Sequence, residues 1–283
     1  MAEEMLNWLC PGPAERVVDG TCGGGGHTAL LAERVGQAGR VLALDRDLDA
    51  VARAQVRFRD RPVDVEHASY CQLAELFAQR GWRQVDKVLL DLGLSSDQLA
   101  SSERGFSFDA AGELDMRFDV TSGEPAWRLL QRTSERDLAD LIFRFGEERL
   151  SRRIARVICQ RRGDVQRWSA RQFADLVRGC YPPGRHDRID PATRTFQALR
   201  IAVNNELARL EDCLRALPDL VVSGGRVAII SFHSLEDRIV KWAFRNDERW
   251  EILTKKPVTA SPDELERNPR SRSAKLRVAQ RRF

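Results

Sequence analysis

The sequence predicts an α/β protein with a largely parallel sheet and an inserted helical domain. Strand and helix patterns alternate from Arg16 to Asp91, which is typical of βαβ units. Between Asp91 and about Asp190 no segment has a convincing strand pattern, and the apolar residues recur at helical spacing. A strand pattern returns after this region. These observations indicate one α/β domain that is interrupted by helices.

The first strand ends at Asp19, and a turn of consecutive glycines joins it to a helix that begins near His27. Without a Cβ, Gly23 to Gly26 can adopt positive φ angles and let a ligand lie against the backbone, next to the free N–H groups of the helix. The second strand ends in Asp45, whose carboxylate can accept both hydroxyls of a ribose. Together these features predict a nucleoside-containing cofactor. The alternative is a structural glycine turn with a solvated Asp45.

The remaining elements follow in order. We expect strands at 41–45, 63–66, 85–91 and 226–230, and helices at 48–58, 73–79, 135–145, 147–162 and 170–178 and from Ser234. The strand at 85–91 is apolar on both faces, which places it centrally. Asp190-Pro191 is typical of a helix start, and apolar residues at helical spacing follow as far as Leu210. We therefore expect one domain made of 1–97 and 191–283 and an insertion of 98–190.

Composition limits the class of protein. A chain of 283 residues can bury a sizeable core, and its formal net charge of +4 is only a weak indication of an acidic partner. Apolar runs are shorter than a membrane span, and the first residues lack the pattern of an export signal. The six cysteines have no paired spacing, which favours reduced thiols in a cytoplasm over disulfides or a zinc site. We expect no metal.

Ligands in open α/β sheets bind at the carboxyl ends of the strands, so the residues there are candidates for the site. They are Asp19, Asp45, Tyr70, Asp91 and His233. Tyr70 could stack on an adenine or simply pack, and the loop that Asp91 begins could serve only to cap a helix. His233 could exchange a proton with a substrate, and a solvated loop histidine is the alternative. Ser234 and Asp237 have the spacing of a capping box.

A stripe of arginines in the insertion is a second candidate site. Its members are Arg149, Arg152, Arg153 and Arg156 on one side of the expected helix 147–162, with Arg194 added from the segment 191–200. Only Glu147 and Glu148 oppose the stripe, and residues 267–283 add seven basic residues and no acidic one. Exposed arginines often serve only for solvation, but these clusters together favour contact with phosphate. Aromatic residues of the insertion could stack on a base, with core packing as the alternative.

Eight segments in order along the chain carry a family resemblance. They are 19–27 (DGTCGGGGH), 44–47 (LDRD), 89–96 (LLDLGLSS), 103–108 (ERGFSF), 114–117 (LDMR), 191–200 (PATRTFQALR), 231–238 (SFHSLEDR) and 271–277 (SRSAKLR). The set closely resembles the bacterial 16S rRNA cytosine-N4 methyltransferases, the RsmH (MraW) family. This resemblance implies a Rossmann-like class I methyltransferase sheet with a helical substrate-recognition insertion. It also implies that S-adenosyl-L-methionine donates a methyl group to the exocyclic N4 amine of one cytidine in the decoding region.

The resemblance also assigns the cofactor-binding residues. They are Gly24, Gly25, Gly26 and His27 near the methionine end of the cofactor, Asp45 at its ribose, Tyr70 at its adenosine, and Asp91 and Gln98 completing the pocket. The chain lacks the Asp/Asn-Pro-Pro-Tyr/Phe segment that amine-methylating DNA enzymes commonly use. We therefore expect Asp91 or a backbone carbonyl of its loop, together with His233, to accept the proton of the amine. One departure is that residues 1–13 lack the family's His-Xaa-Pro-Val segment.

The expected partner is 16S rRNA, within the small ribosomal subunit in the cytoplasm and away from membranes. A homodimer is compatible with the sequence. Two other functions compete: a nicotinamide-dependent oxidoreductase would use the same glycine turn and Asp45, and a non-catalytic RNA-binding ribosome-assembly factor would need only the basic clusters. Comparing the binding of NAD with that of S-adenosylmethionine by titration would identify an oxidoreductase. RNA binding without methyl transfer would identify an assembly factor. Neither accounts for so many ordered motifs of one family.

Overall fold

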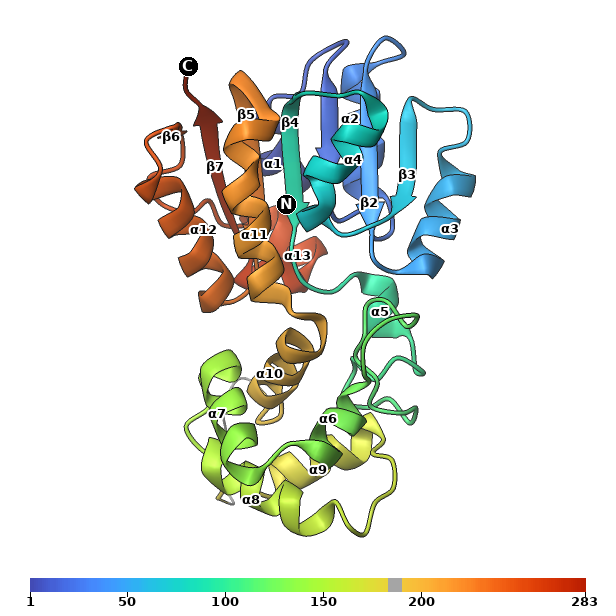
Figure 1. Ribbon diagram of the computed structural model, residues 1–283, viewed down its shortest axis with the longest axis vertical. Coiled ribbons are helices and arrows are strands. Elements are labelled where there is room, and N and C mark those ends of the chain that lie inside the picture. Colours follow the sequence, from blue (N-terminus) through green and yellow to red (C-terminus); the bar gives the residue numbers. More distant parts are fainter. Residues whose placement is uncertain (183–189) are drawn as a thin grey trace. The chain divides into compact units, whose positions relative to one another are not determined.

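The structure is a computed structural model that describes residues 1–182 and 190–283 (Figure 1). These residues form two compact units, one of Met1–Gly93 with Leu207–Phe283 and one of Leu94–Glu206. The sequence places the domain boundaries at 97/98 and 190/191, so the segment 191–206 falls in the second unit here. The functional division into two domains stays a prediction.

A seven-stranded sheet forms the centre of the first unit, in the order β3-β2-β1-β4-β5-β7-β6. The strands are β1 (Arg16–Asp19), β2 (Arg40–Asp45), β3 (Val63–His67), β4 (Val85–Asp91), β5 (Val221–Ser231), β6 (Trp250–Ile252) and β7 (Lys275–Arg281). β1 to β5 are parallel, whereas β7 runs antiparallel to both β5 and β6. β4 is central, as its apolar sequence predicts. The carboxyl ends of β1, β2, β4 and β5 therefore meet at one edge.

β7 is the largest departure from expectation. From the sequence, residues 267–283 are expected to be a basic tail that is available to phosphate. Instead, Leu276 and Val278 are buried in the sheet, and the Arg277 guanidinium lies 2.6 Å from the carboxylate of Asp237. Residues 275–281 are a strand between two others, so the basic residues of this part cannot be counted as a free cluster.

Helices cover both faces of the sheet. α4 (Leu73–Arg80), α11 (Glu206–Leu220) and α12 (Ser234–Asn246) pack on one face and lie in front of the sheet in Figure 1. α1 (Ala2–Leu9), α2 (Gly26–Val35) and α3 (Leu48–Arg57) pack on the other, and α13 (Pro262–Arg267) follows β6. Alternate residues of β2 enter the two cores, with Leu42 and Leu44 on one side and Val41 and Ala43 on the other. This is why the strands are apolar on both faces.

The second unit is helical. Its helices are α5 (Ser96–Ala100), α6 (Ala126–Arg132), α7 (Glu135–Gly146), α8 (Ser151–Arg161), α9 (Ala170–Arg178) and α10 (Thr193–Asn204). α7 and α9 confirm the expected helices. α8 begins later than expected because Glu147 adopts a positive φ of 49°, which ends α7. The apolar run to Leu210 is likewise two helices, separated at Asn205 with a φ of 52°.

Two further expectations concern membranes and thiols. Among the residues that the structure describes, no helix is long and apolar enough to cross a membrane. Each of the six cysteines is unpaired, in agreement with their irregular spacing.

Candidate active site

The glycine turn after β1 is anchored to the end of β2. The Gly23 N–H donates to Asp45 Oδ2 at 2.7 Å, and the Asp47 N–H donates to Asp45 Oδ1 at 2.9 Å. The Cys22 N–H adds a bond to the Leu44 carbonyl at 2.8 Å. Burial raises the pKa of Asp45, and the two backbone N–H groups oppose that effect. Each Asp45 oxygen thus accepts one backbone N–H and keeps a further lone pair.

The same turn is packed on one side and open on the other. A Cβ on Gly25, whose φ is +76°, would lie 2.8 Å from the ring of Phe58 at the end of α3. The neighbouring Arg57 guanidinium donates to the Gly24 carbonyl. A Cβ on Gly26, by contrast, would meet no atom within 4 Å. The turn therefore presents bare backbone at the start of α2, where a ligand can approach.

Asp19, at the end of β1, is fully buried and holds the start of α2. Its Oδ2 accepts the Thr28 hydroxyl at 2.6 Å, and its Oδ1 accepts the Thr21 N–H at 3.2 Å. Burial raises the pKa of Asp19, and these bonds oppose that effect. Thr28 is not among the residues that the sequence predicts for the site. A hydroxyl residue in the first turn of a helix that follows a strand-end acid is the signal that could have indicated it.

His27 and Asp91 form a pair between α2 and the end of β4. His27 Nε2 lies 3.3 Å from Asp91 Oδ2, and the Asp91 N–H donates to the Thr21 hydroxyl at 2.7 Å. Burial lowers the pKa of His27, but the hydrogen bond and the charge of Asp91 outweigh it, so the pKa is raised. Asp91 Oδ1 and His27 Nδ1 are both buried without a hydrogen-bond partner in 1–182 and 190–283. Buried polar atoms without a partner are rare in folded proteins, so these two mark this edge as a candidate ligand site.

Tyr70 lies near the same edge, beyond β3. It begins a short 3₁₀ helix (Tyr70–Gln72) and is half-buried. A Cβ on Gly20, directly after β1, would lie 3.0 Å from Tyr70 Cβ. The structure thus brings the sequence-predicted residues Gly24 to Gly26, His27, Asp45, Tyr70 and Asp91 into one unit, around the ends of β1 to β4.

His233 has a different environment from the one expected. It is the N-cap of α12: its Nδ1 accepts the Glu236 N–H at 3.4 Å, and its Nε2 lies 3.1 Å from Glu236 Oε1. The capping box consists of His233 and Glu236, so the expected box of Ser234 and Asp237 is wrong. The His233 side chain is only 9% exposed. This geometry favours a structural role, and the catalytic role of His233 stays a prediction.

Gln98 belongs to the second unit. It is the third residue of α5, and its side-chain oxygen accepts the Ser95 N–H at 3.0 Å in a capping box. This supports the helix-capping interpretation of the loop after Asp91. A contact between Gln98 and the cofactor stays a prediction.

The arginine stripe lies on the surface of the second unit, but it has more acidic neighbours than expected. Arg156 lies 3.6 Å from Glu135 of α7, and Asp140 of α7 lines the same hollow as Arg152 and Arg156. Glu148 does not oppose the stripe, because it is buried and accepts the Tyr181 hydroxyl at 2.6 Å. The expectation that only Glu147 and Glu148 oppose these arginines is therefore wrong. The members of the stripe, Arg149, Arg152, Arg153, Arg156 and Arg194, are all exposed.

Comparison with known proteins identifies the chain's relatives. A sequence profile of the MraW methylase family matches residues 1–282. The chain belongs to this family. One relative, the ribosomal RNA small subunit methyltransferase H of Rhodopirellula baltica, is 50% identical over 294 residues that cover 99% of this chain and 90% of the relative. The protein of the same name from Sorangium cellulosum is also 50% identical, over 99% of this chain and 89% of the relative.

The fold agrees with this membership of the MraW methylase family. A solved structure named PH0851 is similar, with a TM-score of 0.50 and 15% sequence identity. The match covers 99% of this chain and 45% of that one, and it concerns the fold alone. The sheet is that of a Rossmann-like class I methyltransferase, with the helical unit inserted between β4 and β5. Both parts of this arrangement are as the sequence predicts.

Proposed function

We propose that this chain transfers a methyl group from S-adenosyl-L-methionine to the N4 amine of a cytidine in the decoding region of 16S rRNA. The observation that carries the proposal is the match, over nearly the whole of both chains, to relatives named ribosomal RNA small subunit methyltransferase H. The buried acceptors beside the glycine turn support the chemistry. A nicotinamide-dependent oxidoreductase or a non-catalytic assembly factor would not require this combination.

The residues around the turn fit S-adenosyl-L-methionine. The open backbone at Gly26 leaves room for a ligand, and Asp45 keeps lone pairs for the two ribose hydroxyls. The unpartnered His27 Nδ1 supplies a polar atom near the start of α2. We assign Gly24, Gly25, Gly26 and His27 to the methionine end, Asp45 to the ribose, Tyr70 to the adenosine, and Asp91 with Gln98 to the rest of the pocket.

Asp91 is the residue best placed to activate the amine. When bound, the cofactor supplies a methyl carbon that is already activated for displacement, so orientation provides much of the rate. The lone pair of a cytosine amine is delocalised into the ring, and a hydrogen bond from its N–H to the carboxylate of Asp91, whose side chain is 30% exposed, would raise the electron density on nitrogen. The same carboxylate would accept the N–H proton when the amine takes the methyl group that the bound cofactor would supply. His27, 3.3 Å from Oδ2, holds the carboxylate in place.

Recognition of the RNA is assigned to the exposed arginines of the second unit. Arginine side chains bind phosphates through their planar forks, and this set would hold the strand while the target base leaves its stack. The members are Arg149, Arg152, Arg153, Arg156 and Arg194. We further propose that the substrate is the small ribosomal subunit in the cytoplasm, which suits a chain whose cysteines are all unpaired. A homodimer stays a prediction.

The test is incorporation of methyl groups from labelled cofactor into small subunits that lack the modification, with the nucleoside identified by mass. We expect N4-methylcytidine at a single position. Asp91→Asn should lower the turnover at saturating cofactor and subunit by about 10²–10⁴-fold, the usual contribution of a positioned proton acceptor. Asp64→Asn is the matched control, because Asp64 is exposed on β3 and should leave the turnover unchanged. Normal turnover of Asp91→Asn would refute the assignment, and binding of NAD in preference to the cofactor would refute the function.

A further inference from the structure

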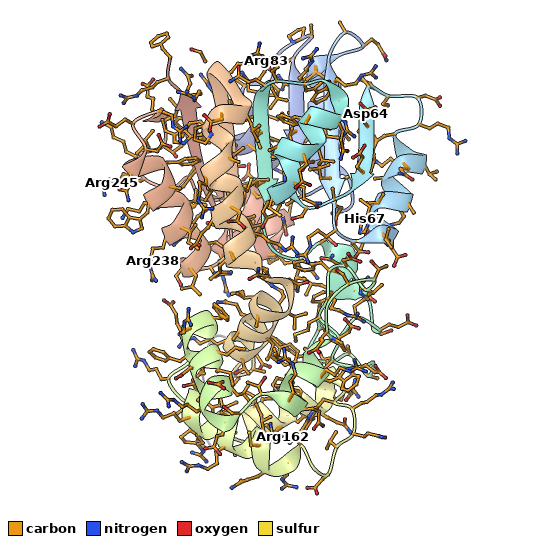
Figure 2. All side chains as sticks on the ribbon, in the orientation of Figure 1. Asp64, His67, Arg83, Arg162, Arg238 and Arg245 are labelled. Carbon is orange, nitrogen blue, oxygen red and sulfur yellow. The ribbon has the colours of Figure 1, made fainter. Side chains whose placement is uncertain are left out.

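The outward face of α12 combines positive charge with an exposed indole. Arg238, Lys241, Trp242 and Arg245 recur at the spacing of one helical face. Trp242 is 47% exposed, and its ring centroid lies 5.4 Å from Lys241 Nζ and 5.9 Å from the centre of the Arg245 guanidinium. Figure 2 shows Arg238 and Arg245 extending from the outer side of the helix. We call these four residues the α12 face.

The acidic side chains of α12 do not pair with Lys241 or Arg245. Its two acids, Glu236 and Asp237, are both in the first turn: Glu236 is buried against His233, and Asp237 pairs with Arg277 of β7. Neither Lys241 nor Arg245 forms an ion pair with any residue that the structure describes. The arginine stripe of the second unit differs, since its Arg156 is paired with Glu135.

We propose that the α12 face binds single-stranded RNA, with a base stacked against Trp242 and phosphates held by Lys241 and Arg245. Surfaces that bind single strands combine basic side chains along the backbone with aromatic rings that accept a base of any identity. An acidic protein segment would be attracted by the same charges, and the polyglutamate arm of the test below distinguishes it from RNA. The choice of RNA as the partner rests on the proposed function. The location of the contact rests on α12 alone.

The position of α12 in the fold suits an extension of the substrate site. The helix begins directly after β5, at the edge of the sheet where the candidate active site lies. At about 1.5 Å of rise per residue, Trp242 lies about 12 Å along the helix from Ser234. A strand bound there would run away from the active edge along the first unit, so α12 could hold RNA that extends from the target base.

The test is binding of the full chain to a 12-nucleotide oligouridylate, followed by fluorescence anisotropy over a range of salt concentrations. Trp242→Ala should weaken binding by about 5- to 100-fold, whereas Trp242→Phe, which keeps a ring for stacking, should stay within about threefold of the parent. The double variant Lys241→Ala with Arg245→Ala should reduce the slope of log affinity against log salt by about 1.4, because each phosphate contact on a single strand contributes about 0.7.

Arg215→Ala is the matched control for charge, because Arg215 on α11 is 75% exposed and is paired with Asp212. It should change neither the affinity nor the slope. Every variant should bind S-adenosylhomocysteine as the parent does, which shows that the first unit is folded.

Oligouridylate affinity within twofold of the parent for Trp242→Ala, or an unchanged salt slope for the double variant, would overturn the proposal. So would polyglutamate binding as tight as that of oligouridylate and insensitive to Trp242→Ala, because the face would then be suited to an acidic protein. The two proposals can fail separately. If small subunits gain no N4-methylcytidine but the Trp242 effect on oligouridylate is present, the proposed function fails and the RNA-binding face stands.

Discussion

Two neighbouring glycines of the turn after β1 should respond in opposite ways to the same substitution. Gly25 has a φ of +76°, and a Cβ there would lie 2.8 Å from the ring of Phe58, which is 1% exposed. Alanine in the left-handed region costs about 1–2 kcal/mol, and forcing a buried ring aside costs about 1–3 kcal/mol. Gly25→Ala should therefore lower the free energy of unfolding by about 2–5 kcal/mol.

Gly26 is the matched control, because a Cβ there meets nothing within 4 Å and the residue is the first of α2. Gly26→Ala should leave the free energy of unfolding unchanged within about 0.5 kcal/mol or raise it slightly, since alanine is the better helix former. It should instead weaken S-adenosylhomocysteine binding by about tenfold or more, because the methyl group would occupy ligand space, and a tenfold loss corresponds to about 1.4 kcal/mol.

Urea unfolding followed by circular dichroism, together with calorimetric titration of S-adenosylhomocysteine, measures both effects. Equal loss of stability in the two variants would refute the geometry of the turn. Unchanged cofactor affinity in Gly26→Ala would refute the assignment of that open side to the cofactor.

Three further outcomes follow from the titrating groups. Burial raises the pKa of Asp237, but its basic partners on β7 outweigh that effect, so the pKa is lowered. The contribution of Asp237 to stability is therefore present above about pH 3.8 and is lost as the pH falls through the folded pKa. Asp237→Asn should destabilise the protein more at pH 7 than at pH 3 in urea unfolding. The pKa of His27 is raised by Asp91, which outweighs the opposite effect of burial. The contribution of His27 to stability is therefore present below about pH 6.5 and is lost as the pH rises through the folded pKa. Asp91→Asn should flatten the pH dependence of the free energy of unfolding in this range. Burial raises the pKa of Cys22 to about 12, so iodoacetamide at pH 8 should label the exposed Cys10 first by mass spectrometry, and equal labelling of Cys22 would contradict the structure.

Much of the first unit could be predicted because its signals are local. Val17-Val18-Asp19 followed by glycines predicts a strand, a turn and a helix without any knowledge of the partners, and each of these is present. The break at Asn205 was missed because asparagine is also tolerated inside helices, and only the tertiary structure places it at a φ of 52°. β7 was missed because Arg277 occupies a buried position where apolar residues are the norm, and its partner Asp237 is 40 residues away in the sequence.

The residues of the candidate site likewise fall into those that could be predicted from the sequence and those that could not. The ends of β1, β2 and β4 could be read from the sequence, because parallel strands must bring those residues to one edge. The surroundings of His233 and of the arginine stripe could not be read from the sequence. Whether a histidine faces a ligand or bonds to the first turn of its own helix depends on side-chain orientation, as with the His233 contact to Glu236. Similarly, the acid that opposes Arg156 comes from α7, a separate helix.

The split sheet also affects how the protein is made. β4 is followed by the whole helical unit, Leu94–Glu206, before the chain reaches β5 and β7. At about 5–20 residues per second, translation of those roughly 110 residues takes about 6–20 s, during which the open edge of β4 has no neighbour. The helical unit is continuous in sequence and can fold as it emerges, whereas the methyltransferase sheet closes only after the last strand leaves the ribosome. During that interval the apolar edge of β4 is exposed to pairing with another chain.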